Sequence, residues 1–247
     1  RRVRRWGGGG HEAIGTGGMG KVFEAHDTRV GRTVALKLMR ALARDRPSLV
    51  RRFHREYRGM AMIFHPGVPR VFDAGIDDTG RVYYTMDLIR GEPLLACAKT
   101  GLKPRDKLAL VRAVADILIK VHEAGVVHRD IKPSNILIDR DHRPHLIDFG
   151  ACSLSEGADA ETSVSPALNL NTAPGTWIGT LGYIDPEMLE GAACSARSDI
   201  YSLAATLSWL FTRQHPSADA LAPLPQTGIE SVDALLRQGM ARAADAR

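Results

Sequence analysis

The stretch from Val126 to Leu137 constrains the fold of this chain more than any other. It reads Val-Val-His-Arg-Asp-Ile-Lys-Pro-Ser-Asn-Ile-Leu, so one short polar turn holds Asp130, Lys132 and Asn135 between two apolar runs. Burying charged side chains between apolar segments costs free energy, so such a cluster indicates a functional site. A second apolar run ends in Asp148-Phe149-Gly150, and pairing of the two runs as a hairpin would bring that carboxylate to the same place. Two acids, an amide and a lysine would then face one point, which suits a magnesium-bound phosphate and a hydroxyl nucleophile.

A glycine-rich segment near the amino terminus reads Ile-Gly-Thr-Gly-Gly-Met-Gly, so Gly15, Gly17 and Gly20 match G-x-G-x-x-G. A dinucleotide-binding oxidoreductase needs a helix after these glycines, but the residues that follow alternate and carry β-branched side chains like strands. We therefore exclude that class and expect the glycines to cap a hairpin. Their missing side chains would let backbone N–H groups approach phosphate oxygens, with Val22 covering a purine ring. A hairpin tip without a ligand is the plainer alternative.

Lys37 ends the apolar run Val34-Ala35-Leu36. An ammonium group that leaves a buried strand needs a partner acid or a phosphate. A helix is expected to start near Ser48, and Glu56 lies close to its apolar face. We expect Glu56 to pair with Lys37, although each residue alone is explained equally well as a solvated side chain.

The pattern changes from strands to helices near residue 90. The strands expected before this point span residues 21–25, 33–39, 68–72 and 82–86, and the helices expected after it span 94–100 and 104–124. We expect an α+β fold with a flexible tail or linker at 1–10, a small antiparallel-sheet lobe with one main helix at 11–90, and a larger, mostly helical lobe at 91–247. The connection between the lobes would offer the carbonyl of Asp87 and the amide of Ile89 to an adenine.

The composition bounds the other functions. The chain has 247 residues and a formal net charge of +5, and its arginine-rich stretches suit solvated surfaces, so we do not expect nucleic-acid binding. Cys97, Cys152 and Cys194 are widely spaced and odd in number, which favours a reducing cytoplasm over a disulfide framework or a zinc site. No run of about twenty apolar residues and no signal peptide is visible. Because the chain begins with Arg1, tethering through segments of a longer parent protein stays open.

Taken together, residues 14–247 resemble the catalytic domain of a protein kinase, most closely the Hanks-type (eukaryotic-like) serine/threonine kinases of bacteria. The resemblance rests on the glycine loop, the Lys37 strand, Met-Asp-Leu at the hinge, His-Arg-Asp-Ile-Lys-Pro-Ser-Asn and Asp-Phe-Gly, which occur in the family's order. It implies a two-lobed kinase fold. It also implies transfer of the γ-phosphoryl group of ATP to Ser or Thr hydroxyls of proteins, with Mg²⁺ or, as a substitute, Mn²⁺.

The resemblance implies a role for each matched residue. Asp130 would be the catalytic base, Lys132 would neutralise the γ-phosphoryl group, and Lys37, paired with Glu56, would hold the α- and β-phosphates. Lys132, in place of an alanine-arginine pattern, favours Ser or Thr over Tyr as the acceptor.

The implied metal ligands are Asn135 and Asp148. The implied contacts of ATP, besides Lys37, are Ile14, Gly15, Thr16, Gly17, Gly18, Gly20, Val22, Ala35, Met86, Asp87, Ile89 and Leu137. The resemblance also implies an apolar column that crosses between the lobes, formed by Met60, Val71, His128 and Phe149.

Residues 150–185 match the activation segment and are rich in Ser and Thr. Arg129 precedes the base, so a phosphate in this segment could pair with its guanidinium and order the segment. Thr172 and Thr176 are the expected sites, from their distance to Gly179-Thr180, and self-association would allow autophosphorylation between copies. A disordered polar loop is the plainer alternative.

Four further expectations concern the carboxyl-terminal part. Glu187, in Asp185-Pro186-Glu187 where the family has Ala-Pro-Glu, is expected to form a buried pair with Arg247. An acid at Asp185 is favoured by the start of a helix. Asp199 resembles the family residue that braces the backbone of the His-Arg-Asp turn. The family's final helix has no counterpart in these residues.

Two other functions stay open. One is a pseudokinase or nucleotide-binding scaffold, against which the intact Lys37, Asp130, Asn135 and Asp148 argue, because a binding module needs no base. The other is a kinase module of a larger enzyme that acts on a small molecule or a dedicated peptide. The glycine loop and the segment around Thr180 favour a kinase that acts on protein substrates over such a module. The sequence identifies neither the substrate nor the activating signal.

Overall fold

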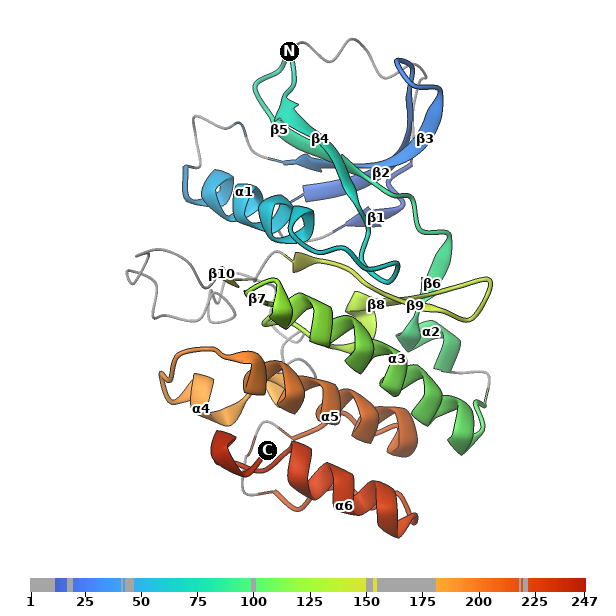
Figure 1. Cartoon of the computed structure of the whole chain (residues 1–247), viewed down its shortest axis with the longest axis vertical. Coiled ribbons are helices and arrows are strands. Elements are labelled where there is room, and N and C mark those ends of the chain that lie inside the picture. The colour runs from blue at the N-terminus through green and yellow to red at the C-terminus, as the bar shows by residue number, and fades with distance from the viewer. Residues whose placement is uncertain are drawn as a thin grey trace.

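The computed structural model describes residues 12–16, 20–40, 42, 47–98, 101–149, 153–154, 181–217, 219 and 222–247. These residues form two lobes, with a sheet and one helix in the first and mostly helices in the second (Figure 1). The expected α+β, two-lobed fold is therefore confirmed. The predictions for residues 1–10, Gly17, Gly18, Thr172 and Thr176 lie outside the described residues.

A five-stranded antiparallel sheet forms most of the first lobe. Its strands are β1 (Gly15–Thr16), β2 (Gly20–Asp27), β3 (Arg32–Met39), β4 (Val71–Ile76) and β5 (Val82–Met86), in the order β1-β2-β3-β5-β4. Helix α1 (Pro47–Ala61) packs on this sheet, where its Phe53 ring lies 5.0 Å from the ring of Tyr84. The central position of β3 explains its continuous apolar run, because such a strand is buried on both faces.

Strand β4 begins later than the predicted 68–72. The carbonyl of Gly67 accepts a hydrogen bond from the amide of Leu146 in the second lobe, at 2.8 Å. A Cβ at Gly67 would lie 2.4 Å from the Ile117 side chain, so the backbone is in close contact there. The residues before β4 are thus held against the second lobe and are not available to pair in the sheet.

Helices α3 (Pro104–Glu123) and α5 (Ala196–Thr212) form the centre of the second lobe, and α6 (Glu230–Gly239) packs on α5 (Figure 1). The boundaries predicted for α3 are confirmed to within one residue. Pro104 at its start has no N–H to leave unpaired, and Gly125, at φ 70°, follows its end. Helix α5 starts with a capping box between Ser195 and Ser198.

Short strands, one-turn helices and 3₁₀ turns complete the described chain. They are β6 (Gly91–Pro93), α2 (Leu94–Cys97), β7 (Val126–Val127), β8 (Ile136–Asp139), β9 (Pro144–Leu146), β10 (Ser153–Leu154), α4 (Pro186–Leu189) and 3₁₀ turns at Pro133–Asn135, Leu181–Tyr183 and Ala244–Ala246. Strands β8 and β9 pair antiparallel, with Ile136 opposite Leu146, so the hairpin expected from the sequence is present. Within the described ranges, no helix has the length and apolarity needed to span a membrane.

Candidate active site

Lys37 lies where β3 faces the second lobe. Strand pairing places it opposite Val22 of β2 and Tyr84 of β5. Its Nζ donates to Glu56 Oε1 of α1 and lies 3.2 Å from Asp148 Oδ1, which belongs to the second lobe. The Tyr84 hydroxyl donates to the same Glu56 oxygen at 2.9 Å. The contact expected between Lys37 and Glu56 is therefore present, and Tyr84 is a partner that the sequence reasoning missed.

The charges of this cluster depend on one another. Burial disfavours the charged form of Lys37, but the carboxylates of Glu56 and Asp148 outweigh burial and raise the pKa of Lys37 above its usual value. Burial raises the pKa of Glu56, against the opposing effect of Lys37. Burial opposes ionisation of Asp148 as well, yet the ammonium of Lys37 brings the pKa of Asp148 below its usual value. At neutral pH the site thus holds a protonated Lys37 beside an ionised Asp148.

The turn between β7 and β8 holds Asp130, Lys132 and Asn135 together. Lys132 Nζ lies 2.8 Å from both carboxylate oxygens of Asp130. Asn135 Nδ2 donates to the carbonyl of Asp130 at 2.8 Å and to its Oδ2 at 2.9 Å. Both amide hydrogens of Asn135 therefore point at Asp130, which leaves Asn135 Oδ1 as the atom able to ligate a cation.

Asp199 of α5 fixes the backbone of this turn, as expected from the sequence. Its Oδ2 accepts from the amide of His128 and its Oδ1 from the amide of Arg129, both at 2.9 Å. His122 Nε2 lies 2.8 Å from Asp199 Oδ2, a contact that the sequence reasoning did not identify. Arg129 has φ 69°, a left-handed conformation that is strained for a residue with a side chain. The buried carboxylate thus holds the residue before Asp130 in a conformation that it would not adopt alone.

Asp148 and Phe149 follow β9 and connect the two lobes. Asp148 also has a left-handed backbone, with φ 65°, and its side chain is about 41% exposed. The buried Phe149 ring lies 4.5 Å from the ring of His128. Met60 and the partly buried Val71 pack in the same apolar core as Phe149. The residues of the expected column are therefore gathered in one buried region.

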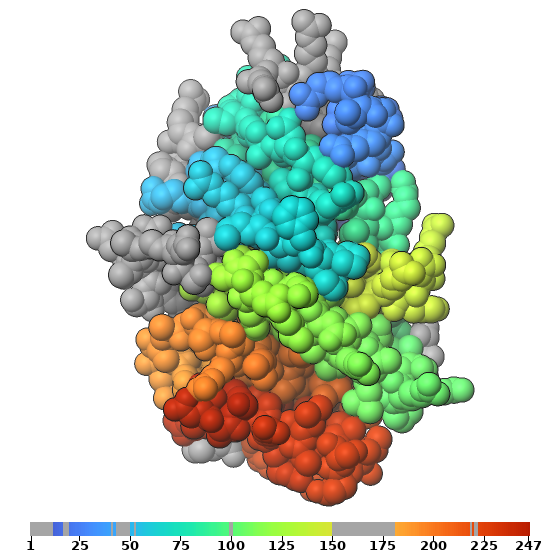
Figure 2. Space-filling model, in the orientation of Figure 1, coloured from blue at the N-terminus to red at the C-terminus, as the bar shows by residue number. Residues whose placement is uncertain are grey.

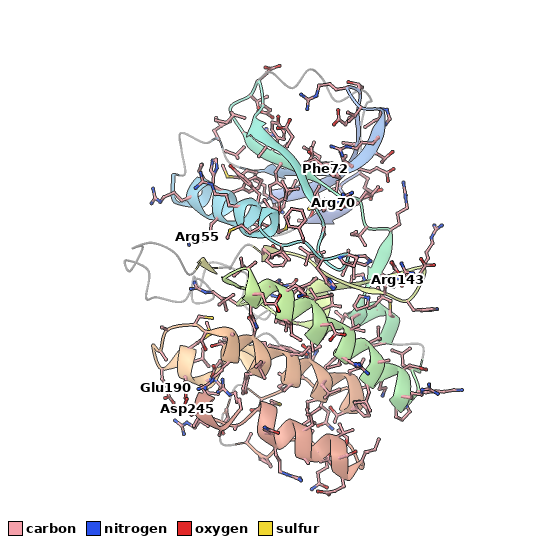
Figure 3. All side chains as sticks on the ribbon, in the orientation of Figure 1. Arg55, Arg70, Phe72, Arg143, Glu190 and Asp245 are labelled. Atoms are coloured by element: carbon pink, nitrogen blue, oxygen red, sulfur yellow. The ribbon has the colours of Figure 1, made fainter. Side chains whose placement is uncertain are left out.

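The connection between the lobes runs beside a cavity of about 980 Å³. Ile14 and Ile89, both predicted to contact ATP, line this cavity, whereas Val22, Ala35 and Leu137 are not among its described lining residues. Two hydrogen bonds join Asp87 to Arg70, which is labelled in Figure 3. The amide of Asp87 donates to the carbonyl of Arg70 at 3.0 Å, and the amide of Arg70 donates to Asp87 Oδ2 at 2.9 Å.

The remaining predicted contacts lie on paired strands of the first lobe and on β8. Gly15 and Thr16 form β1, Val22 lies opposite Gly15, and Ala35 lies opposite Met86. Gly20, the last glycine of the predicted phosphate-binding loop, also has a packing reason to be glycine. A Cβ there would lie 2.4 Å from the carbonyl oxygen of Leu38, so the close approach of β2 and β3 requires glycine at this position.

The pair predicted between Glu187 and Arg247 is wrong. The Arg247 guanidinium binds both oxygens of Asp185, at 2.6 and 2.8 Å, and Glu187 Oε1 accepts from the amide of Ala244 at 2.8 Å. Asp185 also caps α4, because its Oδ1 accepts from the amide of Glu187 at 3.1 Å. The aspartate that replaces the family's alanine lies closer to the guanidinium than the glutamate does.

Comparisons with known proteins show the family. A family model described as "Protein kinase domain" matches residues 10–231. A probable serine/threonine-protein kinase of Streptomyces coelicolor is 37% identical over 209 residues, which cover 82% of this chain and 30% of that protein. Serine/threonine-protein kinase PknA of Mycobacterium tuberculosis is 39% identical over 196 residues, which cover 77% of this chain and 43% of PknA. Serine/threonine-protein kinase PknB of Mycolicibacterium smegmatis is 36% identical over 212 residues, or 83% of this chain and 32% of PknB. The chain thus spans less than half the length of these relatives.

Proposed function

The chain belongs to the protein kinase family, and we propose that it transfers the γ-phosphoryl group of ATP to Ser or Thr hydroxyls of proteins. The observation that carries this proposal is the buried contact of Lys37 with Glu56 and Asp148, which joins three elements of two lobes beside the turn that holds Asp130. A protonated lysine held between two acids is a fixed positive charge at the point where phosphates would enter. A domain that bound no phosphate would not need this fixed positive charge between its lobes.

ATP would lie between the two lobes. Lys37 would bind the α- and β-phosphates, and Glu56 would keep the ammonium group in place. We assign the adenine to the hinge backbone of Asp87 and Ile89, with Ile14 above it. The other proposed contacts are Gly15, Thr16, Gly17, Gly18, Gly20, Val22, Ala35, Met86 and Leu137.

The residues at the cleft fit a magnesium ion. The amide oxygen of Asn135 has only a 3.5 Å contact with Ser134 Oγ, and Asp148 has an ionised, partly exposed carboxylate. Both groups are the hard oxygen ligands that Mg²⁺ prefers, and Mn²⁺ accepts the same donors. When bound, the ion would neutralise charge on the phosphate oxygens.

Asp130 would orient the acceptor hydroxyl and take its proton. The hydroxyl oxygen attacks the γ-phosphorus, the bond from that phosphorus to the β–γ bridging oxygen breaks, and ADP leaves. Lys132 Nζ lies 2.8 Å from both Asp130 oxygens, so it is held beside the base, where it would neutralise charge on the transferred group. This role of Lys132 favours Ser and Thr acceptors.

Regulation, partners and location are further parts of the proposal. Residues 150–185 would be the activation segment, phosphorylated at Thr172 or Thr176, with Arg129 receiving the phosphate. Arg129 is a fitting receiver because, among the described residues, its buried Nε has no hydrogen-bond partner. Self-association would bring two copies together for this reaction. We assign the domain to the cytoplasm.

Mass spectrometry after incubation with ATP and Mg²⁺ tests the proposal. The unmodified sequence should gain phosphate on Ser or Thr and phosphorylate a serine-containing protein, and Asp130→Asn should do neither. Asp141→Asn, a change of the same size at an exposed residue, should behave like the unmodified sequence. ATP binding without any transfer would favour the pseudokinase, and transfer to a small molecule or a single dedicated peptide alone would favour the module of a larger enzyme.

A further inference from the structure

Tyr84 of β5 is buried next to the ion pair of Lys37 and Glu56. The register of β3 and β5 places Tyr84 opposite Lys37, and directly paired residues of antiparallel strands project from the same face of a sheet. The Tyr84 ring centroid lies 6.0 Å from Lys37 Nζ. Its hydroxyl donates to Glu56 Oε1 of α1 at 2.9 Å. One tyrosine thus contacts both members of the pair.

The same side chain also holds α1 on the sheet. The rings of Phe53 and Tyr57 lie 5.0 and 6.0 Å from the ring of Tyr84. Together with Glu56 they occupy positions i, i+3 and i+4, which lie on one face of a helix. Figure 2 shows α1, in light blue, lying directly against the teal segment that contains β4 and β5. One face of α1 is therefore fixed by a single side chain of β5.

The hydrogen bonds of Glu56 fall on one carboxylate oxygen. Oε1 accepts from Lys37 Nζ and from the Tyr84 hydroxyl. The buried Oε2 has no hydrogen-bond partner among the residues that the structure describes. Lys37 Nζ also lies 3.2 Å from Asp148 Oδ1, so its ammonium group is shared between two acids. Without the Tyr84 hydroxyl, the position of the Glu56 carboxylate would depend on a lysine that Asp148 also attracts.

The hydroxyl is the part of Tyr84 that packing does not require. A phenylalanine would fill the same space beside Phe53 and Tyr57. A hydroxyl buried among aromatic rings costs free energy unless it is hydrogen-bonded, and a bond to a carboxylate is stronger than a bond to a neutral acceptor. The contact with Glu56 therefore gives this tyrosine a role beyond core packing.

We propose that Tyr84 is a positioning residue for ATP binding, whose hydroxyl holds the Glu56 carboxylate, and with it α1, where Lys37 is kept beside the phosphates. The inference rests on the proposed kinase function, because it concerns the lysine that would bind the α- and β-phosphates. Tyr84 touches no reacting atom and acts through Glu56. Its hydroxyl affects the affinity for ATP and leaves binding of the protein substrate unchanged.

The test compares Tyr84→Phe with Tyr83→Phe, each of which removes one hydroxyl from a buried tyrosine of β5. Tyr83 is the matched control, because neighbouring residues of a strand project from opposite faces of the sheet. Steady-state kinetics should show a KM for ATP that is about tenfold higher in Tyr84→Phe, with the KM for a serine-containing protein substrate unchanged. Tyr83→Phe should keep both KM values. Equal KM values for ATP in the two variants would overturn the proposal, as would a lower kcat with an unchanged KM for ATP.

A double-mutant cycle tests whether Tyr84 acts through Glu56. Isothermal titration calorimetry with ATP and Mg²⁺ measures the affinity of each variant. Glu56→Leu, a change of similar size that removes the acceptor, should weaken ATP binding by itself. Tyr84→Phe should then add less than about a twofold change, because its partner is already absent. A further tenfold loss in the Glu56→Leu background would contradict action through Glu56.

Amide hydrogen exchange gives a readout without ATP. Residues 53–57 should exchange faster in Tyr84→Phe than in Tyr83→Phe, while α3 exchanges at the same rate in both. Equal exchange at 53–57 would overturn the positioning role even if ATP affinity fell. If the unmodified sequence bound ATP without transferring phosphate, the proposed function would fail, and the ATP affinities of the two variants would still decide the role of Tyr84.

Discussion

Replacing Asp199 by Asn should damage the catalytic turn through its backbone. The carboxylate accepts from the amides of His128 and Arg129 and lies 2.8 Å from His122 Nε2. An asparagine can keep its oxygen in the Oδ2 position, but its NH₂ group then faces the amide of Arg129. That amide becomes a buried donor without an acceptor, which costs about 1–3 kcal/mol, and the two remaining bonds lose the strength that the charge gave them, about 1 kcal/mol each. We expect the free energy of unfolding to fall by roughly 4 kcal/mol.

The same change should lower the rate of phosphoryl transfer. Arg129 is held at φ 69°, and a left-handed conformation costs a residue with a side chain roughly 1–2 kcal/mol. Without its acceptor the residue can relax and move Asp130 with it. A displacement of about 1 Å is enough to lower kcat by about a hundredfold.

Urea unfolding and initial rates at saturating ATP measure both effects. Asp78→Asn is the matched control, since Asp78 is exposed in the turn between β4 and β5 and should change the free energy of unfolding by less than about 0.5 kcal/mol. If Asp199→Asn unfolds at the same urea concentration as the control and keeps its kcat, the role given to this anchor is refuted.

Two further predictions concern the first lobe. Gly20→Ala should lower the free energy of unfolding by roughly 2 kcal/mol, because its Cβ would lie 2.4 Å from the carbonyl oxygen of Leu38. Gly15→Ala is the control, since its Cβ would make only an ordinary 3.7 Å contact and should change thermal stability little. Equal melting temperatures of the two variants would contradict the close packing of β2 and β3. The raised pKa of Lys37 means that its ion pairs stabilise the folded state fully below the unfolded value of 10.5 and are lost as pH rises further. Urea unfolding at increasing pH should therefore show a steeper loss of stability above about pH 10.5 in the unmodified sequence than in Lys37→Met, and parallel curves would count against the pairing.

Much of the fold could be predicted from local patterns. The hairpin of β8 and β9 followed from two apolar runs on either side of a turn, and α3 followed from its helical period and its initial proline. The contact of Lys37 with Glu56 was predictable for a simple reason: a lysine in a buried strand needs an acid, and α1 offers one near its apolar face.

The errors arose where contacts between residues distant in sequence determine the structure. Asp185 and Glu187 lie within one helical turn, so spacing alone could not decide which reaches Arg247; the N-cap position of Asp185 decided it in the fold. The start of β4 was misplaced because Gly67 bonds to Leu146, a contact between residues distant in sequence. Tyr84 was missed although strand pairing puts it opposite Lys37, since that register depends on the order of the sheet.

The most direct test of the central claim is the rate of phosphoryl transfer from ATP to serine in a protein substrate by Asp130→Asn, measured beside its ATP affinity. We predict that the rate falls by about a hundredfold or more while ATP binds as tightly as before, because the change removes a proton acceptor and leaves the nucleotide contacts intact. Transfer at an unchanged rate would contradict the assignment of Asp130 as the base. Absence of transfer in the unmodified sequence, with ATP bound, would contradict the proposed kinase activity.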